Sequence, residues 1–197
     1  MLASINPLGE RARNQQYRVT VTAYIAASTV AGAALGGALG FVGAPLALPL
    51  VALVGVGGLA TVGLLGDARR NAARALGPRR QVDENWLVNY RGWVYGAGFG
   101  AQLGFAFATI VTASATWIAF ACALLSGSPL AGLVIGAIFG VTRALPILAG
   151  AGVHDPATLR GLVRRLERLR PRVAVTTTAV QGAAAIGLLA LAVTRAA

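Results

Sequence analysis

The sequence predicts an all-α protein, specifically a polytopic helical membrane protein, and three observations support this fold class. Of its 197 residues 56% are hydrophobic and 12% charged, with a mean hydropathy of +0.70, outside the usual composition of a soluble domain. The charges gather in clusters between long uncharged runs. Within several of these runs glycine recurs at every fourth position, a pattern that is costly for a helix in water and typical of helices packed in lipid.

Four membrane spans follow directly from length. A helix needs roughly 20 apolar residues to cross a hydrocarbon core of about 30 Å. Residues 19–42, 46–66, 129–150 and 173–194 meet this requirement, and Arg143 is the only charged residue among them. The segment before the first run is polar, and that run is longer than a signal-peptide core. We therefore expect an uncleaved first helix.

Residues 92–126 contain no charge but do not fit one simple crossing. A straight helix of this length would measure about 52 Å at 1.5 Å per residue, whereas two crossings would each be barely long enough. The basic loops 67–91 and 151–172 favour one crossing, because it places both loops and the N-terminus on the cytoplasmic side. We predict five spans, with residues 92–126 forming a long or broken one; six spans are the alternative.

The chain shows a weak internal repeat. The triplets at 16–18 (QYR) and 89–91 (NYR) each open an apolar run, which is followed by a short turn, a second run and a basic helix beginning at Asp67 or Asp155. This order predicts a parallel duplication of a two-helix unit plus a closing helix. Chance likeness between alanine-, glycine- and leucine-rich runs is the alternative.

The glycine spacing predicts helix-packing faces. Small residues four apart let two helix backbones approach closely in lipid. Packing within the chain is the simpler interpretation, and a seam between copies or partner subunits is the alternative. The glycines of these faces are Gly32, Gly36, Gly40, Gly92, Gly96, Gly100, Gly104, Gly132, Gly136 and Gly140.

Arg143 is the leading candidate for a substrate-binding residue. A charge inside a span costs at least about 2.5 to 3.5 kcal/mol near the membrane centre and marks a functional site or a buried pair by default. Pro146 follows it and should loosen the helix there. The alternative is that Arg143 reaches the nearby cytoplasmic interface. Its candidate polar companions are Gln102, Thr109, Thr112 and Thr142.

The second basic loop predicts an amphipathic helix that lies on the membrane. Asp155 is a good N-cap, Pro156 a good first residue, and leucines and a valine form one stripe. We expect this helix to bind anionic lipid headgroups at the cytoplasmic face, with an acidic cytosolic protein as the alternative partner. The arginines assigned to lipid binding are Arg160, Arg164, Arg165 and Arg168.

Enzymatic chemistry finds little support in the sequence. There is one cysteine, Cys122, and one histidine, His154, and we find no metal-ligand cluster, nucleophile motif or phosphate-binding loop. We expect no catalytic residue, no metal and no cofactor. The net charge of +11 is clustered between spans, so we expect no nucleic-acid partner.

These observations lead to two hypotheses about function. The first is a small, transport-related plasma-membrane protein that binds or conducts a small solute near Arg143, with anions the class that its charge favours. The second is a non-catalytic accessory or assembly subunit of a larger membrane complex. In both, the chain is multi-pass with a cytoplasmic N-terminus, and its partners are lipids and either further copies of itself or other membrane subunits.

Overall fold

The structure is a computed structural model, and it describes residues 5–46, 58, 86–106, 115–169, 176 and 179. Within these residues the secondary structure is helical and contains no strand, so the all-α prediction is confirmed there. Two helical segments, Tyr17–Gly43 and Pro129–Gly150, are long and apolar enough to cross a membrane. Core helices of soluble proteins and signal sequences pass the same test of length and composition. Most of the predicted spans 46–66 and 173–194 lies outside the described residues.

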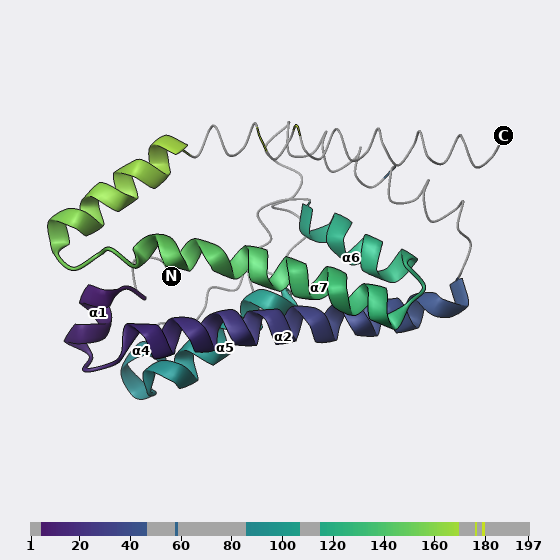
Figure 1. The fold of residues 1–197 in the computed structure, drawn as a ribbon, viewed down its shortest axis with the longest axis horizontal. Coiled ribbons are helices and arrows are strands. Elements are labelled where there is room, and N and C mark those ends of the chain that lie inside the picture. The colour runs from purple at the N-terminus through teal and green to yellow at the C-terminus, as the bar shows by residue number, and fades with distance from the viewer. Residues whose placement is uncertain are drawn as a thin grey trace.

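The central element is α2, Tyr17–Gly43, which covers the first predicted span. It ends in a short 3-10 turn, η1 (Ala44–Leu46), at the predicted break between the first two spans. Helix α7, Pro129–Ala144, lies along one side of α2 and runs antiparallel to it, and α5, Gly92–Phe105, lies along another side (Figure 1). The two neighbours of α2 therefore share one helix as a common packing surface.

The run 92–126 is a broken segment. Helix α5 ends where Ala106 adopts the left-handed conformation, with φ of 54°, and α6 spans Ala115–Leu125. The start of α5 lies against Thr20 of α2, and its Gly104 lies against Ser28. Near the end of α6, Leu124 reaches Gly43, at the end of α2. Within the described residues, α5 thus lies along the first half of α2, and the end of α6 lies at the end of α2.

Helix α7 is defined at both ends by local sequence. Ser128 caps its first turn by accepting from the Ala131 N–H, and Pro129 occupies the first helical position. After Ala144 the chain tightens into the 3-10 helix η3, Leu145–Gly150, with Pro146 in its first turn. This change follows from the missing N–H and the ring of proline, which disfavour a continuing α-helix.

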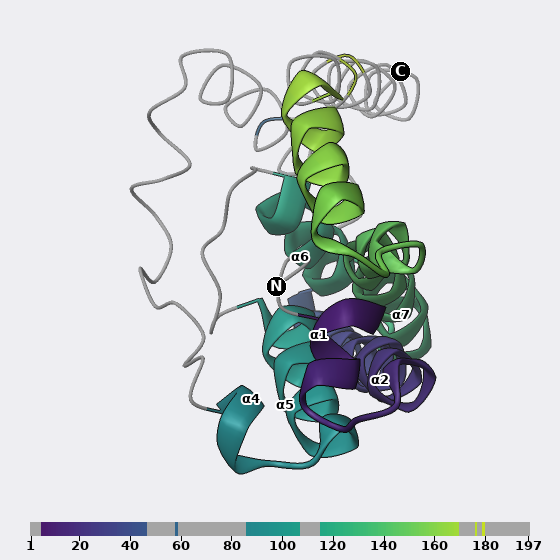
Figure 2. The ribbon, with the colours of Figure 1, turned by 90° about the vertical axis from the view of Figure 1, so that its left-hand side faces the viewer.

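Two further segments lie at the end of the bundle where α2 begins. Helix α1, Pro7–Ala12, packs across this end, and the short α4, Trp86–Asn89, precedes α5 (Figure 2). A helix over 156–169 follows η3 and stands apart from α2. The N-terminal polar segment is therefore more than a flank of the first span, because it contains a helix that contacts the bundle.

Candidate functional site

Arg143 lies in the last turn of α7, half-buried beside aromatic side chains. Its guanidinium carbon is 5.3 Å from the centre of the Phe139 ring, a cation–π arrangement. The Phe139 ring in turn lies 5.4 Å from that of Phe120 on α6, measured between centroids. Tyr24 of α2 also lies close to Arg143. Three helices thus contribute to its surroundings.

The predicted companions of Arg143 have different placements. Thr142 is exposed, and its hydroxyl donates to the Ile138 carbonyl of its own helix at 2.7 Å. Gln102 is half-buried on α5, two residues before Gly104. Thr109 and Thr112 lie outside the described residues. The Thr142 hydroxyl therefore binds the backbone of its own helix, as serine and threonine hydroxyls in apolar helices usually do.

The glycines of α2 and α7 bring two backbones into direct contact. A Cβ atom added to Gly32 would overlap the carbonyl oxygen of Gly136, and one added to Gly36 would overlap that of Gly132. The reverse additions, on α7, would meet the α2 backbone in the same way. Gly40 lies against the Ser128 carbonyl and Gly140 against that of Ser28. This seam lies within one chain and admits no larger side chain at these positions.

The glycines of α5 form a second seam, on another side of α2. A Cβ atom on Gly92 or Gly96 would lie 2.5 Å from an oxygen of Thr20. At Gly100 and Gly104 it would overlap the α2 carbonyls of Tyr24 and Ser28. The stripe that runs from 92 to 104 therefore packs on α2, and within the described residues it is occupied by the same chain.

Ser28 joins the two seams, although sequence reasoning gave it no role. It is fully buried, and its hydroxyl donates to the Gly140 carbonyl of α7 at 2.9 Å. Its own carbonyl oxygen is the closest atom to the Cβ positions of both Gly104 and Gly140. The end of α5 and the last turns of α7 thus meet α2 at one residue.

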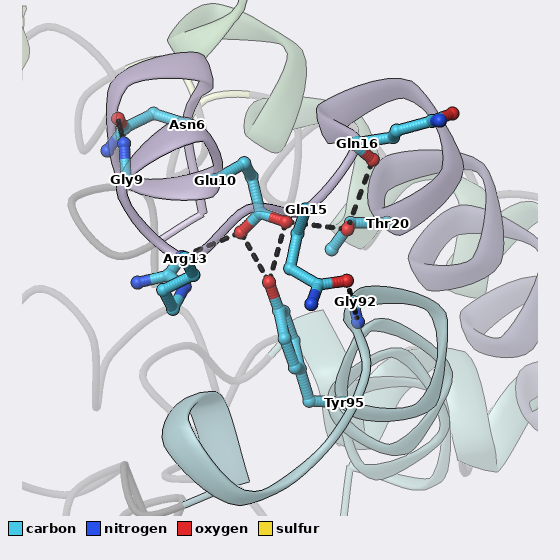
Figure 3. Close-up of polar contacts among 9 residues, drawn as sticks. All are labelled: Asn6, Gly9, Glu10, Arg13, Gln15, Gln16, Thr20, Gly92 and Tyr95. Atoms are coloured by element: carbon cyan, nitrogen blue, oxygen red, sulfur yellow. Dashed lines mark hydrogen bonds and ion pairs between the residues drawn. The ribbon is translucent and has the colours of Figure 1, made fainter.

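A buried carboxylate, Glu10 of α1, is the centre of a polar cluster that sequence reasoning also missed (Figure 3). Tyr95 donates to both of its oxygens at 2.6 Å, and Thr20 donates to one at 2.7 Å. Arg13 forms an ion pair with it at 2.6 Å. Burial opposes the charged form of Arg13, but hydrogen bonds to Glu10 and Tyr95 and the attraction of Glu10 raise its pKa above the ordinary value.

The N-terminal segment that carries Glu10 has further attachments. Asn6 caps α1 by accepting from the Gly9 N–H at 2.9 Å. The Leu8 N–H donates to the Val153 carbonyl at 3.1 Å, and Gln15 accepts from the Gly92 N–H at 2.9 Å. The sequence held one signal for this helix, since asparagine followed by proline is a typical helix start. It held no signal for the partners of Glu10, which come from distant positions.

The helix over 156–169 places the predicted lipid-binding arginines on an exposed surface. Asp155 accepts from the backbone N–H groups of Ala157 and Thr158, at 2.8 and 2.9 Å, which is the predicted N-cap. A shallow pocket on this helix is lined by apolar side chains together with Arg160 and Arg164. The Nε groups of Arg160 and Arg168 donate to carbonyls four residues earlier, which directs these side chains along the helix.

No cluster of three or more histidine, cysteine, aspartate or glutamate side chains suited to a metal occurs in the described part of the chain. The sequence matches no protein family, and neither curated proteins nor solved structures show a significant match to it. The features of the described residues that bear on function are therefore Arg143, the glycine seams and the Glu10 cluster.

Proposed function

We propose that the protein is a multi-pass plasma-membrane protein that binds or conducts a small, anionic solute near Arg143. One observation carries this proposal. Helix α5 ends beside Ser28, at the middle of α2, and Gly140 of α7 packs on the same residue. Arg143 lies about one helical turn beyond Gly140. The end of α5 and the charge of Arg143 therefore lie at similar heights along α2.

The backbone at the end of α5 supports this proposal. In lipid, a helix end leaves carbonyl groups without intrahelical partners, and such ends are tolerated only where protein buries them or a water-filled cavity meets them. Interrupted helices near the middle of a bundle form the binding sites of many transporters. The carbonyls at the end of α5 carry partial negative charge, so the preference for an anion depends on the positive charge of Arg143 alone.

Water accessibility along α7 and η3 tests the proposal. Single cysteines at positions 139 to 147, in a Cys122→Ser background, would be treated with a membrane-impermeant thiol reagent in native membranes. We expect labelling with helical periodicity around Arg143, slowed by a saturating anion. A cysteine at Leu130, which is 72% exposed on the outer surface of α7, is the control for lipid-facing positions. If none of the positions 139 to 147 is labelled, the proposal is wrong.

The second candidate function is a non-catalytic accessory or assembly subunit. Its support is the outer face of α7, where Leu130 is 72% and Ile138 63% exposed, alongside Leu133 and Val134. The glycine stripes give it no support, because within the described residues they are filled by the chain itself. Native mass spectrometry from lipid nanodiscs would show whether the chain is isolated as a monomer, as a homo-oligomer or bound to another subunit.

We propose that anionic lipid is the partner of the helix over 156–169. The support is an exposed surface that combines arginines with Val163, Leu166 and Leu169, each more than a third exposed. A fluorophore at position 163 of the full chain in nanodiscs should shift to the blue when anionic lipid replaces zwitterionic lipid. Replacing Arg164, Arg165 and Arg168 by glutamine should remove the shift. With a cytoplasmic N-terminus, which is part of this proposal, the helix would lie on the inner leaflet.

A further inference from the structure

Residues 5–16, here called the N-terminal segment, are packed into the end of the bundle where Arg143 lies. Ile5 is fully buried in a cluster of side chains from α2, α5, α7 and η3. This cluster includes Tyr24, which lies close to Arg143, and Ala144, which follows Arg143 in the sequence. The other members are Val21, Tyr95, Phe99 and Ile147. The N-terminal segment thus covers the apolar cluster beside Arg143.

The attachments of this segment reach α2, α5 and the residues that follow η3. Glu10 binds Thr20 of α2 and Tyr95 of α5, and the Leu8 N–H binds Val153, beyond η3. Gln15 adds a bond to the first N–H of α5, that of Gly92. Figure 3 shows Glu10 at the meeting point of α1, α2 and α5. A single displacement of α1 would therefore uncover one end of the whole bundle.

The chemistry of these attachments suits reversible closure. Glu10 is fully buried and the Arg13 side chain is 25% exposed. An ion pair with a buried member gains little beyond its desolvation cost, and an apolar replacement often binds more tightly. Glu10 and Arg13 would regain full hydration if α1 left the bundle, and the segment around them is polar. Their short hydrogen bonds nevertheless fix one closed position. Such a contact specifies a closed state without making it permanent.

We propose that the N-terminal segment is a gate over the Arg143 end of the bundle, and that Glu10, with Arg13, Thr20 and Tyr95, is the latch that holds it closed. The inference deepens the proposed function and rests on it, since it names the element that regulates access to that site. Opening exposes Ala144 and its surroundings to water, and closing seals them.

Labelling of a cysteine at Ala144 tests the latch in the full chain. Ala144 is fully buried in the cluster that Ile5 covers, and Ala144→Cys in the Cys122→Ser background is a small change. Adding Glu10→Gln removes the ion pair, and we expect labelling by a membrane-impermeant reagent to accelerate about tenfold or more, as local opening becomes easier. Glu167→Gln, at an exposed acid of the helix over 156–169, is the matched control. Equal rates in both variants would overturn the proposal.

A disulfide lock tests the gate without weakening the cluster. The backbone bond between Leu8 and Val153 places these residues side by side, so Leu8→Cys with Val153→Cys should form a crosslink. Oxidation should abolish labelling at Ala144→Cys, read by mass spectrometry of that peptide, and reduction should restore it. Labelling that continues in the crosslinked protein would overturn the gate, whether or not the Glu10 variant folds.

The failures of the gate and of the solute site give different results. If positions around Arg143 are labelled while neither the lock nor Glu10→Gln changes labelling at Ala144→Cys, the solute site is supported and the gate is overturned. If the lock and Glu10→Gln change labelling at Ala144→Cys as expected while a saturating anion never slows it, the gate is supported and the solute site is not.

Discussion

Tyr95 donates from its hydroxyl to both carboxylate oxygens of Glu10, at 2.6 Å each, across 85 residues of sequence. Both side chains are fully buried. This contact joins the N-terminal segment to α5, and Thr20 extends it to α2. A short polar helix is thereby fixed onto the end of an apolar bundle.

Tyr95→Phe should destabilise the protein by about 1 to 3 kcal/mol, because a buried carboxylate loses a hydrogen-bond donor while the ring is retained. The measurement is unfolding of the detergent-solubilised protein, followed by tryptophan fluorescence. Tyr90→Phe is the control, since Tyr90 is half exposed. Identical transitions for the two variants would show that the Tyr95 hydroxyl contributes nothing to stability.

The adjacent glycines Gly36 and Gly37 should respond oppositely to alanine. A Cβ atom at Gly36 would overlap the Gly132 carbonyl, whereas at Gly37 its nearest atom is 3.6 Å away. Gly36→Ala forces the helices apart, at a cost of about 1 to 3 kcal/mol, while Gly37→Ala gains helix propensity. Melting temperatures of the two variants provide the comparison. A Gly36→Ala protein as stable as Gly37→Ala would contradict the contact between α2 and α7.

Ser28→Ala should lower stability by about 0.6 kcal/mol, the average for hydrogen bonds between membrane helices, and by no more than about 1.7 kcal/mol, the largest value found for one. The Ser28 hydroxyl binds Gly140 on α7, whereas that of neighbouring Thr29 binds Ile25 in its own helix. Thr29→Ala is therefore the control, and we expect a smaller effect from it. Denaturation in mixed micelles measures both variants, and a larger loss for Thr29→Ala would reverse our assignment.

The stabilisation that the Asp155 cap gives to the helix over 156–169 should depend on pH in the acidic range. Hydrogen bonds from the Thr158 hydroxyl and N–H, and then from the Ala157 N–H, hold the pKa of Asp155 below its usual value. Because the folded pKa is lowered, the stabilisation is complete above about 3.8, the ordinary value, and is lost as pH falls through the lowered folded value. Asp155→Ala should remove it at every pH.

Hydrogen exchange of the full chain measures this cap. Amides of Ala157 and Thr158, corrected for intrinsic rates, should exchange faster in Asp155→Ala at neutral pH, and less so in Asp155→Asn, which retains a capping oxygen. Glu167→Ala, which lies near the other end of the same helix, should leave these two amides unchanged. Unaltered protection in Asp155→Ala would show that another group caps the helix.

Much of the local structure follows from composition and spacing. The uncharged run at 19–42 predicted α2 to within two residues at each end, because only a helix satisfies its backbone within such a run. Pro146 predicted a loosened helix, and α7 gives way to a 3-10 turn there. For residues 92–126, the charge argument favoured one crossing, which stays a prediction because residues 107–114 lie outside the described residues.

By itself, the sequence determined the helical class, the first long apolar helix, and which glycines share a face, since all of these depend on periodicity within one segment. Only the tertiary structure decided which glycine faces pack together, because the spacing of glycines in one helix does not identify the helix that packs against them. It brought Gly92 to Gly104 onto one side of α2 and Gly132 to Gly140 onto another. It also buried Glu10, whose burial depends on Tyr95 and Thr20 supplying hydrogen bonds from other helices.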